Sequence, residues 1–169
     1  MTLRKFLILI TTLFFSFNFT IASTNENVRY INVDVILNNS DLGKIIINKL
    51  KKQNDANIDK IKTIENEIKK ENEELTKLKN IITEEEFNKK LVLLKKKIDD
   101  FNILKNKLSN ELNEFKKKEI KLFFEKINPI IEKYMEQNSI ALILDKKNIF
   151  VARSDYDMTQ ELLDLINKD

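Results

Sequence analysis

The feature that most constrains this chain is a long stretch without helix breakers. No glycine follows Gly43 and no proline precedes Pro129, and Leu, Glu and Lys are abundant between them. These residue types favour helix, and nothing in this stretch interrupts it. The middle of the chain is therefore predicted to be long helix.

Apolar residues recur at heptad spacing in both halves of this stretch. In the first half they are Ile47, Ile61, Ile68, Leu75 and Ile82, with Leu50, Ile64 and Leu78 beside them. In the second half they are Phe87, Leu94, Phe101, Leu108, Phe115 and Leu122, with Leu91, Ile98 and Leu112 beside them. We call these residues the seam, and their pattern is typical of a coiled coil. Polar residues interrupt it at Asn54, Asn57, Glu71, Lys105 and Glu119, and these either fix the register or let the helices splay apart.

A turn near residues 81–84 divides the stretch into two helices. Thr83 is an N-cap candidate, and Glu86 completes a capping box three residues later. Two amphipathic helices joined by a short turn pack antiparallel, so we predict a coiled-coil hairpin over residues 41–137, called the arm. At ~1.5 Å per residue the first helix, which should end at Ile81, is about 60 Å long. The second should begin at Glu84, end near Gln137 and kink at Pro129.

The two ends of the chain are predicted to form a small β-rich body, residues 23–40 and 138–169. Residues 28–33 have the pattern of a strand, and residues 34–37 that of a helical turn leading to the N-cap candidates Ser40 and Asp41. Residues 140–144 are a continuous apolar run, which suits a strand buried on both faces. A turn at residues 145–148 predicts a hairpin with residues 149–152.

A last helix is predicted to begin at Asp157, where Gln160 follows three residues later. Its apolar face is formed by Met158, Leu162, Leu165 and Ile166. The body then has only about 55 residues, which is marginal for a core, and its sheet edges remain open. Pairing strands between subunits would close these edges, so we predict an obligate homo-oligomer. The residues predicted to form this oligomerisation body are Val28, Tyr30, Ile31, Val33, Ile140, Leu142, Leu144, Phe150 and Val151.

Residues 1–22 have the pattern of a secretory signal peptide. Arg4 and Lys5 precede an uncharged run, and small residues at Thr20 and Ala22 predict cleavage near Ala22. The alternative, an uncleaved membrane anchor, requires ~20 apolar residues, and this run is shorter. Without Arg4 and Lys5 the chain has 28 basic and 27 acidic residues, from 30 and 27 in the full sequence. Lysines then predominate in the arm and carboxylates in the body.

Composition excludes most catalytic chemistry. The chain has no Cys, no His and a single Gly. Thiol nucleophiles, imidazole bases, His/Cys metal sites and glycine-rich phosphate loops are therefore absent. We predict no enzyme activity, no catalytic residues, no cofactor and no metal. A nucleic-acid binder is disfavoured because the charge is near neutral after cleavage and exposed aromatic residues for stacking are lacking.

The terminal segments resemble the periplasmic Skp/OmpH-like family of outer-membrane-protein chaperones. Residues 28–37 with Ser40-Asp-Leu-Gly-Lys44 are similar to the N-terminal strand of the family and its entry into the arm. Residues 140–145 and 150–166 are similar to its closing block, including a Tyr-Asp-hydrophobe-Thr helix start. The resemblance implies a mainly α jellyfish-like homotrimer with a small β body. It also implies an ATP-independent periplasmic holdase that binds unfolded outer-membrane β-barrel proteins between its arms.

One basic cluster lies just beyond the arm tip. Its residues are Lys89, Lys90, Lys95, Lys96 and Lys97. The cluster either attracts acidic clients and anionic headgroups of lipid or lipopolysaccharide, or is the solvated face of a coiled coil with i,i+4 pairs. Phe87, Phe101 and Phe115 fall on the seam and are predicted to be core. The alternative function for the whole protein is an exported coiled-coil scaffold or tether in the cell envelope, without chaperone activity.

Overall fold

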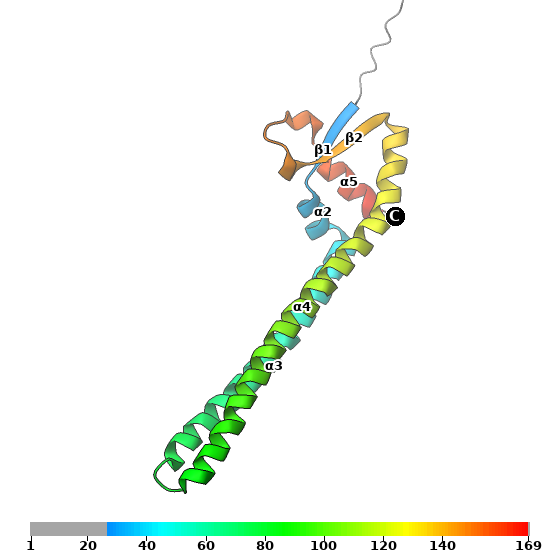
Figure 1. Cartoon of the computed structure of the whole chain (residues 1–169). Helices are drawn as coiled ribbons and strands as arrows, with labels where there is room; N and C mark the ends of the chain where they lie inside the picture. Colours follow the sequence, from blue (N-terminus) through cyan, green and yellow to red (C-terminus); the bar gives the residue numbers. More distant parts are fainter. Residues whose placement is uncertain (1–26, 169) are drawn as a thin grey trace, which may run out of the picture.

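The computed structural model describes residues 27–168 and places a small body at one end of a long helical arm (Figure 1). In chain order the elements are β1 (Asn27–Ile31), α2 (Val33–Asn39), α3 (Asp41–Leu78), α4 (Glu84–Gln137), β2 (Ile140–Asp145), η1 (Lys146–Asn148), η2 (Ser154–Tyr156) and α5 (Thr159–Ile166). The predicted signal peptide lies outside the described residues.

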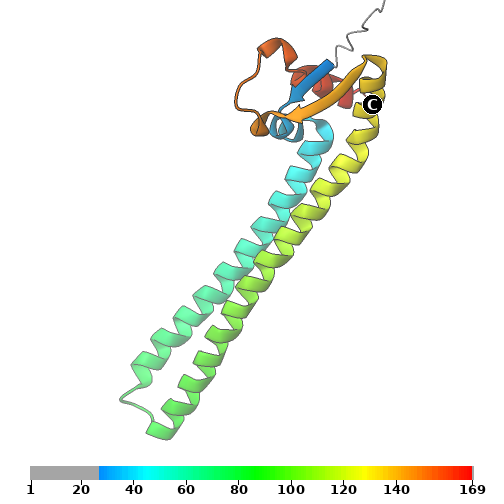
Figure 2. The same cartoon turned by 45° about the horizontal axis from the view of Figure 1, so that its top comes forward.

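Helices α3 and α4 form the arm, and they lie side by side in both Figure 1 and Figure 2. The 38 residues of α3 span about 57 Å at ~1.5 Å per residue. The prediction of an antiparallel hairpin is confirmed, although α3 ends at Leu78 and not at Ile81. The predicted capping box is also confirmed. Thr83 Oγ1 accepts a hydrogen bond from Glu86 N at 3.3 Å, and Glu86 Oε2 accepts one from Thr83 N at 3.4 Å.

The seam residues are half-buried or buried along most of the arm, as predicted, but the buried face shifts near the body. Leu75, Leu94 and Leu108 are buried between the helices. Leu122, predicted to continue the heptads, is 40% exposed, whereas Phe123 is 0% exposed. An α-helix has 3.6 residues per turn, so a strict seven-residue repeat drifts around it unless the partner helix follows. Here α4 leaves α3 and enters the body core, and the buried face moves to Glu119, Phe123 and Ile127. Ile98 is also exposed, against prediction.

The polar seam residues that are buried have hydrogen-bond or ion-pair partners on the opposite helix. Asn57 Nδ2 donates to the carbonyl oxygen of Leu108 at 3.5 Å, across the two helices. Glu119 is buried, and its Oε2 lies 3.2 Å from Lys49 Nζ. Both residues therefore tie α3 to α4. Asn54 is half-buried, and Glu71 and Lys105 are exposed. Glu71 nevertheless links the helices, because its Oε1 accepts a hydrogen bond from Lys97 Nζ of α4 at 2.6 Å.

The body contains a parallel two-stranded sheet that joins the two ends of the chain. Asn27 pairs with Ile140, and Tyr30 pairs with Leu144. The predicted hairpin is wrong: residues 149–152 form no strand in the described part of the chain. After β2 the backbone turns through η1 and leads residues 149–153 away from the sheet. The prediction that residues 140–144 are buried on both faces is also wrong for the single chain, because one face of β2 is uncovered.

The core lies where the two helices of the arm meet the body. Phe123 and Ile127 of α4 pack with residues from β1, α2, α3, β2 and α5. The remaining members of this core are Ile31, Ile36, Ile46, Ile140, Met158, Leu162 and Ile166. The predicted apolar face of α5 is confirmed at Met158, Leu162 and Ile166. The helix begins at Thr159, two residues later than predicted.

A tight corner connects α2 to α3. Ser40 is fully buried, ends α2 and caps α3, its Oγ accepting a hydrogen bond from Gly43 N at 3.1 Å. A Cβ on Gly43 would lie 1.8 Å from the carbonyl oxygen of Leu37. Only glycine permits this approach, which brings the base of the arm against α2.

Helix α4 continues through Pro129 into the body. In both views its ribbon changes direction where it leaves the arm (Figures 1 and 2). Proline removes one backbone hydrogen bond and its ring crowds the preceding turn, which bends a helix without ending it. Ser139, at a φ of 52°, then ends the helix in the left-handed region and directs the chain into β2.

Candidate functional surfaces of the body and arm

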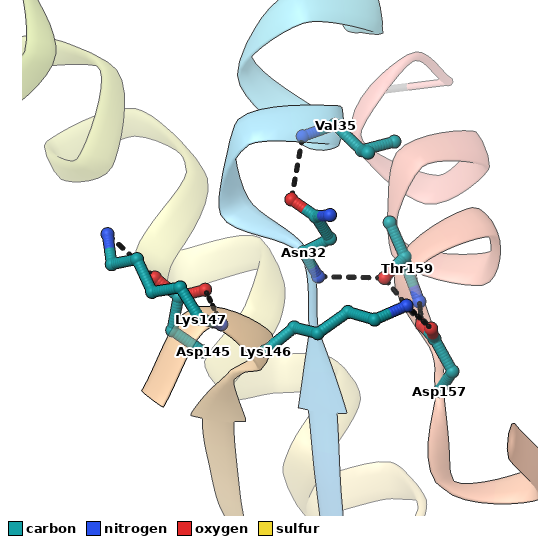
Figure 3. A network of polar contacts seen from close by, with 7 residues as sticks. All are labelled: Asn32, Val35, Asp145, Lys146, Lys147, Asp157 and Thr159. Carbon is teal, nitrogen blue, oxygen red and sulfur yellow. Dashed lines mark hydrogen bonds and ion pairs between the residues drawn. The ribbon is translucent and has the colours of Figure 1, made fainter. Parts of the chain in front are cut away.

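A polar network fixes one end of the loop between β2 and α5, residues 146–158 (Figure 3). Asp157 Oδ1 accepts hydrogen bonds from Thr159 N at 3.0 Å and from Thr159 Oγ1 at 2.5 Å. Asp157 Oδ2 lies 3.3 Å from Lys146 Nζ. Thr159 Oγ1 in turn accepts from Asn32 N at 2.8 Å, and Asn32 Oδ1 caps α2 through Val35 N at 3.1 Å. One carboxylate therefore links the loop, α5 and the end of β1.

The other end of the loop is fixed by Asp145. Its Oδ1 accepts from Lys147 N at 3.2 Å, and its Oδ2 lies 2.8 Å from Lys147 Nζ. Burial acts to raise the pKa of Asp145, but the hydrogen bonds from Lys147 outweigh it and hold the pKa below its ordinary value. Burial likewise acts to raise the pKa of Asp157, and the hydrogen bonds from Thr159 and Lys146 lower it overall. Both carboxylates are therefore held ionised, and the loop is held at both ends.

This loop presents the most exposed apolar residues of the body. Phe150 is fully exposed, and Val151 is 81% exposed. Close by in the chain, Leu142 and Leu144 leave one face of β2 exposed. The outer edge of β1 is occupied, because Met158 N donates to the carbonyl oxygen of Tyr30 at 3.0 Å. Within residues 27–168 no strand pairs with the outer edge of β2. The described part of the body therefore has an uncovered strand edge on β2 and, directly after β2 in the chain, an exposed apolar loop that is held at both ends.

The residues predicted to form the oligomerisation body divide into two groups. Tyr30, Ile31 and Ile140 are buried within this chain, and Val28 and Val33 are half-buried. The exposed members are Leu142, Leu144, Phe150 and Val151. Only this second group is available to a partner without rearrangement.

Sequence reasoning missed a cation–π cluster on the body. The ring of Tyr156 has the guanidinium of Arg29 at 5.1 Å from its centroid and that of Arg153 at 5.6 Å. Arg153 also pairs with both carboxylate oxygens of Asp155, at 3.0 and 2.7 Å. The sequence has only three arginines, and the two within the described residues both contact this tyrosine. Arginine stacks on aromatic rings better than lysine does, but Arg29 and Arg153 lie far apart in the chain, so the sequence showed only the scarcity of arginine beside lysine.

Within the predicted basic cluster of the arm, some lysines are in ion pairs and others are not. Lys97 Nζ donates to Glu71 Oε1 at 2.6 Å and to Glu67 Oε2 at 3.2 Å, which joins α4 to α3. These hydrogen bonds raise the pKa of Lys97 above its ordinary value. Lys89 pairs with Glu85 at 2.7 Å within α4. Among the described residues, no ion pair involves Lys90, Lys95 or Lys96, and all three are exposed.

Three large apolar side chains are exposed close to the arm tip. Ile81 in the turn is 74% exposed, and Val92 and Leu93 on α4 are 65% and 67% exposed. Val92 and Leu93 line a shallow groove with Glu85, Asn88 and Lys89. The tip thus combines apolar and basic side chains. The seam phenylalanines, predicted to be core, are only half-buried; they are Phe87, Phe101 and Phe115.

Within residues 27–168, no cluster of acidic side chains has the arrangement of a metal site. In the same part of the chain, no helix is both long and apolar enough to cross a membrane.

The fold defines a class of protein in which a small body carries a long antiparallel helical arm. The sequence matches the family described as outer membrane protein (OmpH-like) over residues 27–166, and the chain belongs to this family. The resemblance of its terminal segments to that family is thereby confirmed. Members of this family are periplasmic chaperones and not enzymes, and membership implies a role as an outer membrane protein chaperone.

The fold also resembles a solved structure. An OmpH-like protein from Caulobacter crescentus CB15 superposes with a TM-score of 0.73 at 15% sequence identity, covering 84% of each chain. This likeness supports the arrangement of arm and body. A comparison with curated proteins gives no significant match.

Proposed function

We propose that this protein is an ATP-independent periplasmic holdase that binds unfolded outer-membrane β-barrel proteins between the arms of a homotrimer. The observation that carries the proposal is the arm itself. Helices α3 and α4 project far from the core as a hairpin (Figure 2), and basic and apolar side chains on this hairpin are exposed to solvent. Many weak contacts on several such arms would hold a flexible chain loosely, with avidity supplied by the number of arms.

The trimer is supported by the uncovered surface of the body. An open edge on β2 next to the fully exposed Phe150 is unfavourable for an isolated chain in water. Pairing of residues 149–153 with β2 of a neighbouring copy would close that edge and bury Phe150. Asp145 and Asp157 already hold the two ends of the loop, which lowers the conformational entropy that residues 149–153 lose on association.

The holdase activity is tested with a urea-unfolded outer-membrane β-barrel protein. The barrel is diluted into buffer with and without the mature chain, and aggregation is followed by light scattering. Suppressed aggregation at a small molar excess of oligomer is expected, with an unfolded cytoplasmic protein as comparison. If a folded, oligomeric chain suppresses nothing, the protein is instead an envelope scaffold or tether.

The arm tip favours a second candidate role, contact with anionic headgroups of lipid or lipopolysaccharide. Exposed Val92 and Leu93 close to Lys89, Lys90, Lys95 and Lys96 suit a surface that is anionic outside and apolar beneath. Co-sedimentation with vesicles containing phosphatidylglycerol, and not with neutral vesicles, is the expected result. Equal sedimentation with both would contradict this role.

Export is part of the same proposal. Residues 1–22 are proposed to be removed after Ala22, so that the mature chain begins at Ser23. The intact mass of the protein recovered from the periplasm tests this directly, because retention of the segment would leave a heavier chain.

A further inference from the structure

A groove runs along the base of the arm, between α3 and α4 and close to α2. Its volume is about 590 Å³. Half-buried apolar side chains from both helices line it, namely Ile47, Leu50, Leu112 and Ile120. At this end of the arm the two helices therefore leave apolar surface accessible instead of closing over it.

Three side-chain amides also line this groove, and one of them, Asn38, already donates to the carbonyl oxygen of Asp34 at 2.7 Å. Asn54 on α3 is half-buried at a seam position, and Asn113 on α4 is exposed. In residues 27–168 neither amide has a hydrogen-bond partner among the contacts of the structure, whereas Asn57, one turn beyond Asn54, bonds to the carbonyl oxygen of Leu108. An amide offers both a donor and an acceptor, and leaving it unpaired as it is desolvated is costly. Asn54 and Asn113 thus offer their hydrogen-bonding groups to whatever fills the groove.

Two lysines line the same groove, one from each helix. Lys51 and Lys116 are both exposed, and no ion pair among the described residues involves either of them. By contrast, Lys49 on α3 is paired with Glu119. An occupant that carries carboxylates would complement the two unpaired charges.

We propose that this groove binds an extended segment of unfolded polypeptide that carries apolar and acidic side chains. The proposal rests on the holdase function and names a binding surface for it. An extended segment fits because its backbone N–H and C=O groups are unpaired and match the free amides, whereas the backbone of a helix is already satisfied. The apolar side chains contact the floor of the groove, and the acidic ones contact Lys51 and Lys116.

The probe is a fluorescent peptide in which leucine alternates with aspartate and threonine, compared with the same peptide carrying lysine in place of aspartate. The test variant of the mature chain is Lys51→Glu with Lys116→Glu. The matched control is Lys52→Glu with Lys118→Glu, which makes the same charge change at exposed neighbouring positions that do not line the groove. Light scattering and far-UV circular dichroism establish that each variant keeps its oligomeric state and helix content.

The acidic peptide is expected to bind the groove variant about tenfold more weakly, equivalent to ~1.4 kcal/mol, while the control changes by less than about twofold. A photo-crosslinker at position 113 is expected to label the peptide, and one at position 118 is not. Equal effects of the two variants, or no preference for the acidic peptide, would overturn the proposal. Loss of the oligomer in the groove variant alone would also overturn it, because the groove would then bind a second copy.

The holdase function is tested separately by the light-scattering experiment with an unfolded barrel. If the wild-type chain suppresses aggregation and the two variants bind peptide alike, the holdase stands and the groove proposal falls. If the wild-type chain suppresses nothing, the holdase falls, and the peptide measurement still decides whether the groove binds extended chains.

Discussion

Gly43 shows how one residue controls the attachment of the arm. The carbonyl oxygen of Leu37 occupies the space where a Cβ would be, at 1.8 Å. Gly43→Ala should therefore force α3 away from α2 and lower the free energy of unfolding by about 1–3 kcal/mol or more. Urea unfolding of the mature chain measures this. Lys44→Ala, at the exposed next position, serves as the control, and equal stability of the two variants would contradict the prediction.

Asp157 gives the body a defined dependence on pH. Its pKa in the folded chain lies below the ordinary value of 3.8, so its interactions contribute stability above that value. This contribution is lost as the pH falls through the folded pKa. Asp157→Asn, which keeps an acceptor for Thr159 but loses the charge, should be less stable than wild type at neutral pH. The difference should vanish in strong acid. Thermal unfolding as a function of pH measures it, and a difference that persists unchanged at low pH would contradict the assignment.

At the scale of elements, Lys97 links the two helices of the arm through ion pairs and is not a free surface charge. It joins Glu67 and Glu71 on α3 to α4. Lys97→Met should raise the amide hydrogen-exchange rates of the distal part of α3 and leave the body unchanged. Lys95→Met is the matched control, since no ion pair of the described residues involves Lys95. Equal exchange rates in the two variants would show that the ion pairs of Lys97 contribute nothing to the stability of the arm.

The pair of buried Glu119 and exposed Lys49 predicts two mutational effects of opposite sign. Glu119→Leu removes a buried carboxylate from an apolar seam and should stabilise the arm by about 1 kcal/mol. Lys49→Met leaves that carboxylate without its cation and should destabilise it by about 1–3 kcal/mol. Calorimetric midpoints of the two variants measure both effects. Shifts in the same direction would contradict this account of the pair.

Local signals explain which elements the sequence predicted well. The bounds of α4 follow from the capping box at Thr83 and from the loss of helical pattern after Gln137, and neither depends on distant contacts. The heptad pattern predicted that Leu122 is buried, whereas Phe123 is the buried residue in the structure. Which of the two is buried depends on where α4 leaves α3, and the heptad pattern carries no information about that point. The predicted hairpin failed for a similar reason. Residues 149–152 have the composition of a strand, but the ties at Asp145 and Asp157 lead them away from β2.

The surfaces were predictable only in part. The basic cluster was visible in the sequence, yet whether each lysine is free or paired depends on the opposite helix, as Lys97 demonstrates. The groove at the base of the arm was not predictable, because it arises from the spacing of α3 and α4. The polar seam position Asn54 was noticed in the sequence, and the structure places it at that groove.

At the scale of the whole molecule, we predict that the oligomer depends on the exposed loop of the body, residues 146–158. Phe150→Glu places a charge on the surface proposed to bind a neighbouring copy and should shift the protein from oligomer to monomer at micromolar concentration. Light scattering coupled to gel filtration gives the mass. Val92→Glu, an equally drastic change on the arm, should leave the mass unchanged. An unaltered mass for Phe150→Glu would place the interface elsewhere.

The parallel pairing of β1 with β2 has a consequence for the order of folding. The two strands are separated by the whole arm, and joining such distant segments of a flexible chain costs loop-closure entropy. The arm removes most of this cost, because α3 and α4 form through local contacts and return the chain to its starting point. The hairpin therefore acts as the crossover connection of the sheet, and we expect the body to complete its fold after the arm has formed. Since α4 runs back along α3 before it enters the body, equal numbers of heptads can be added to or removed from the two helices of the arm while the body keeps its geometry.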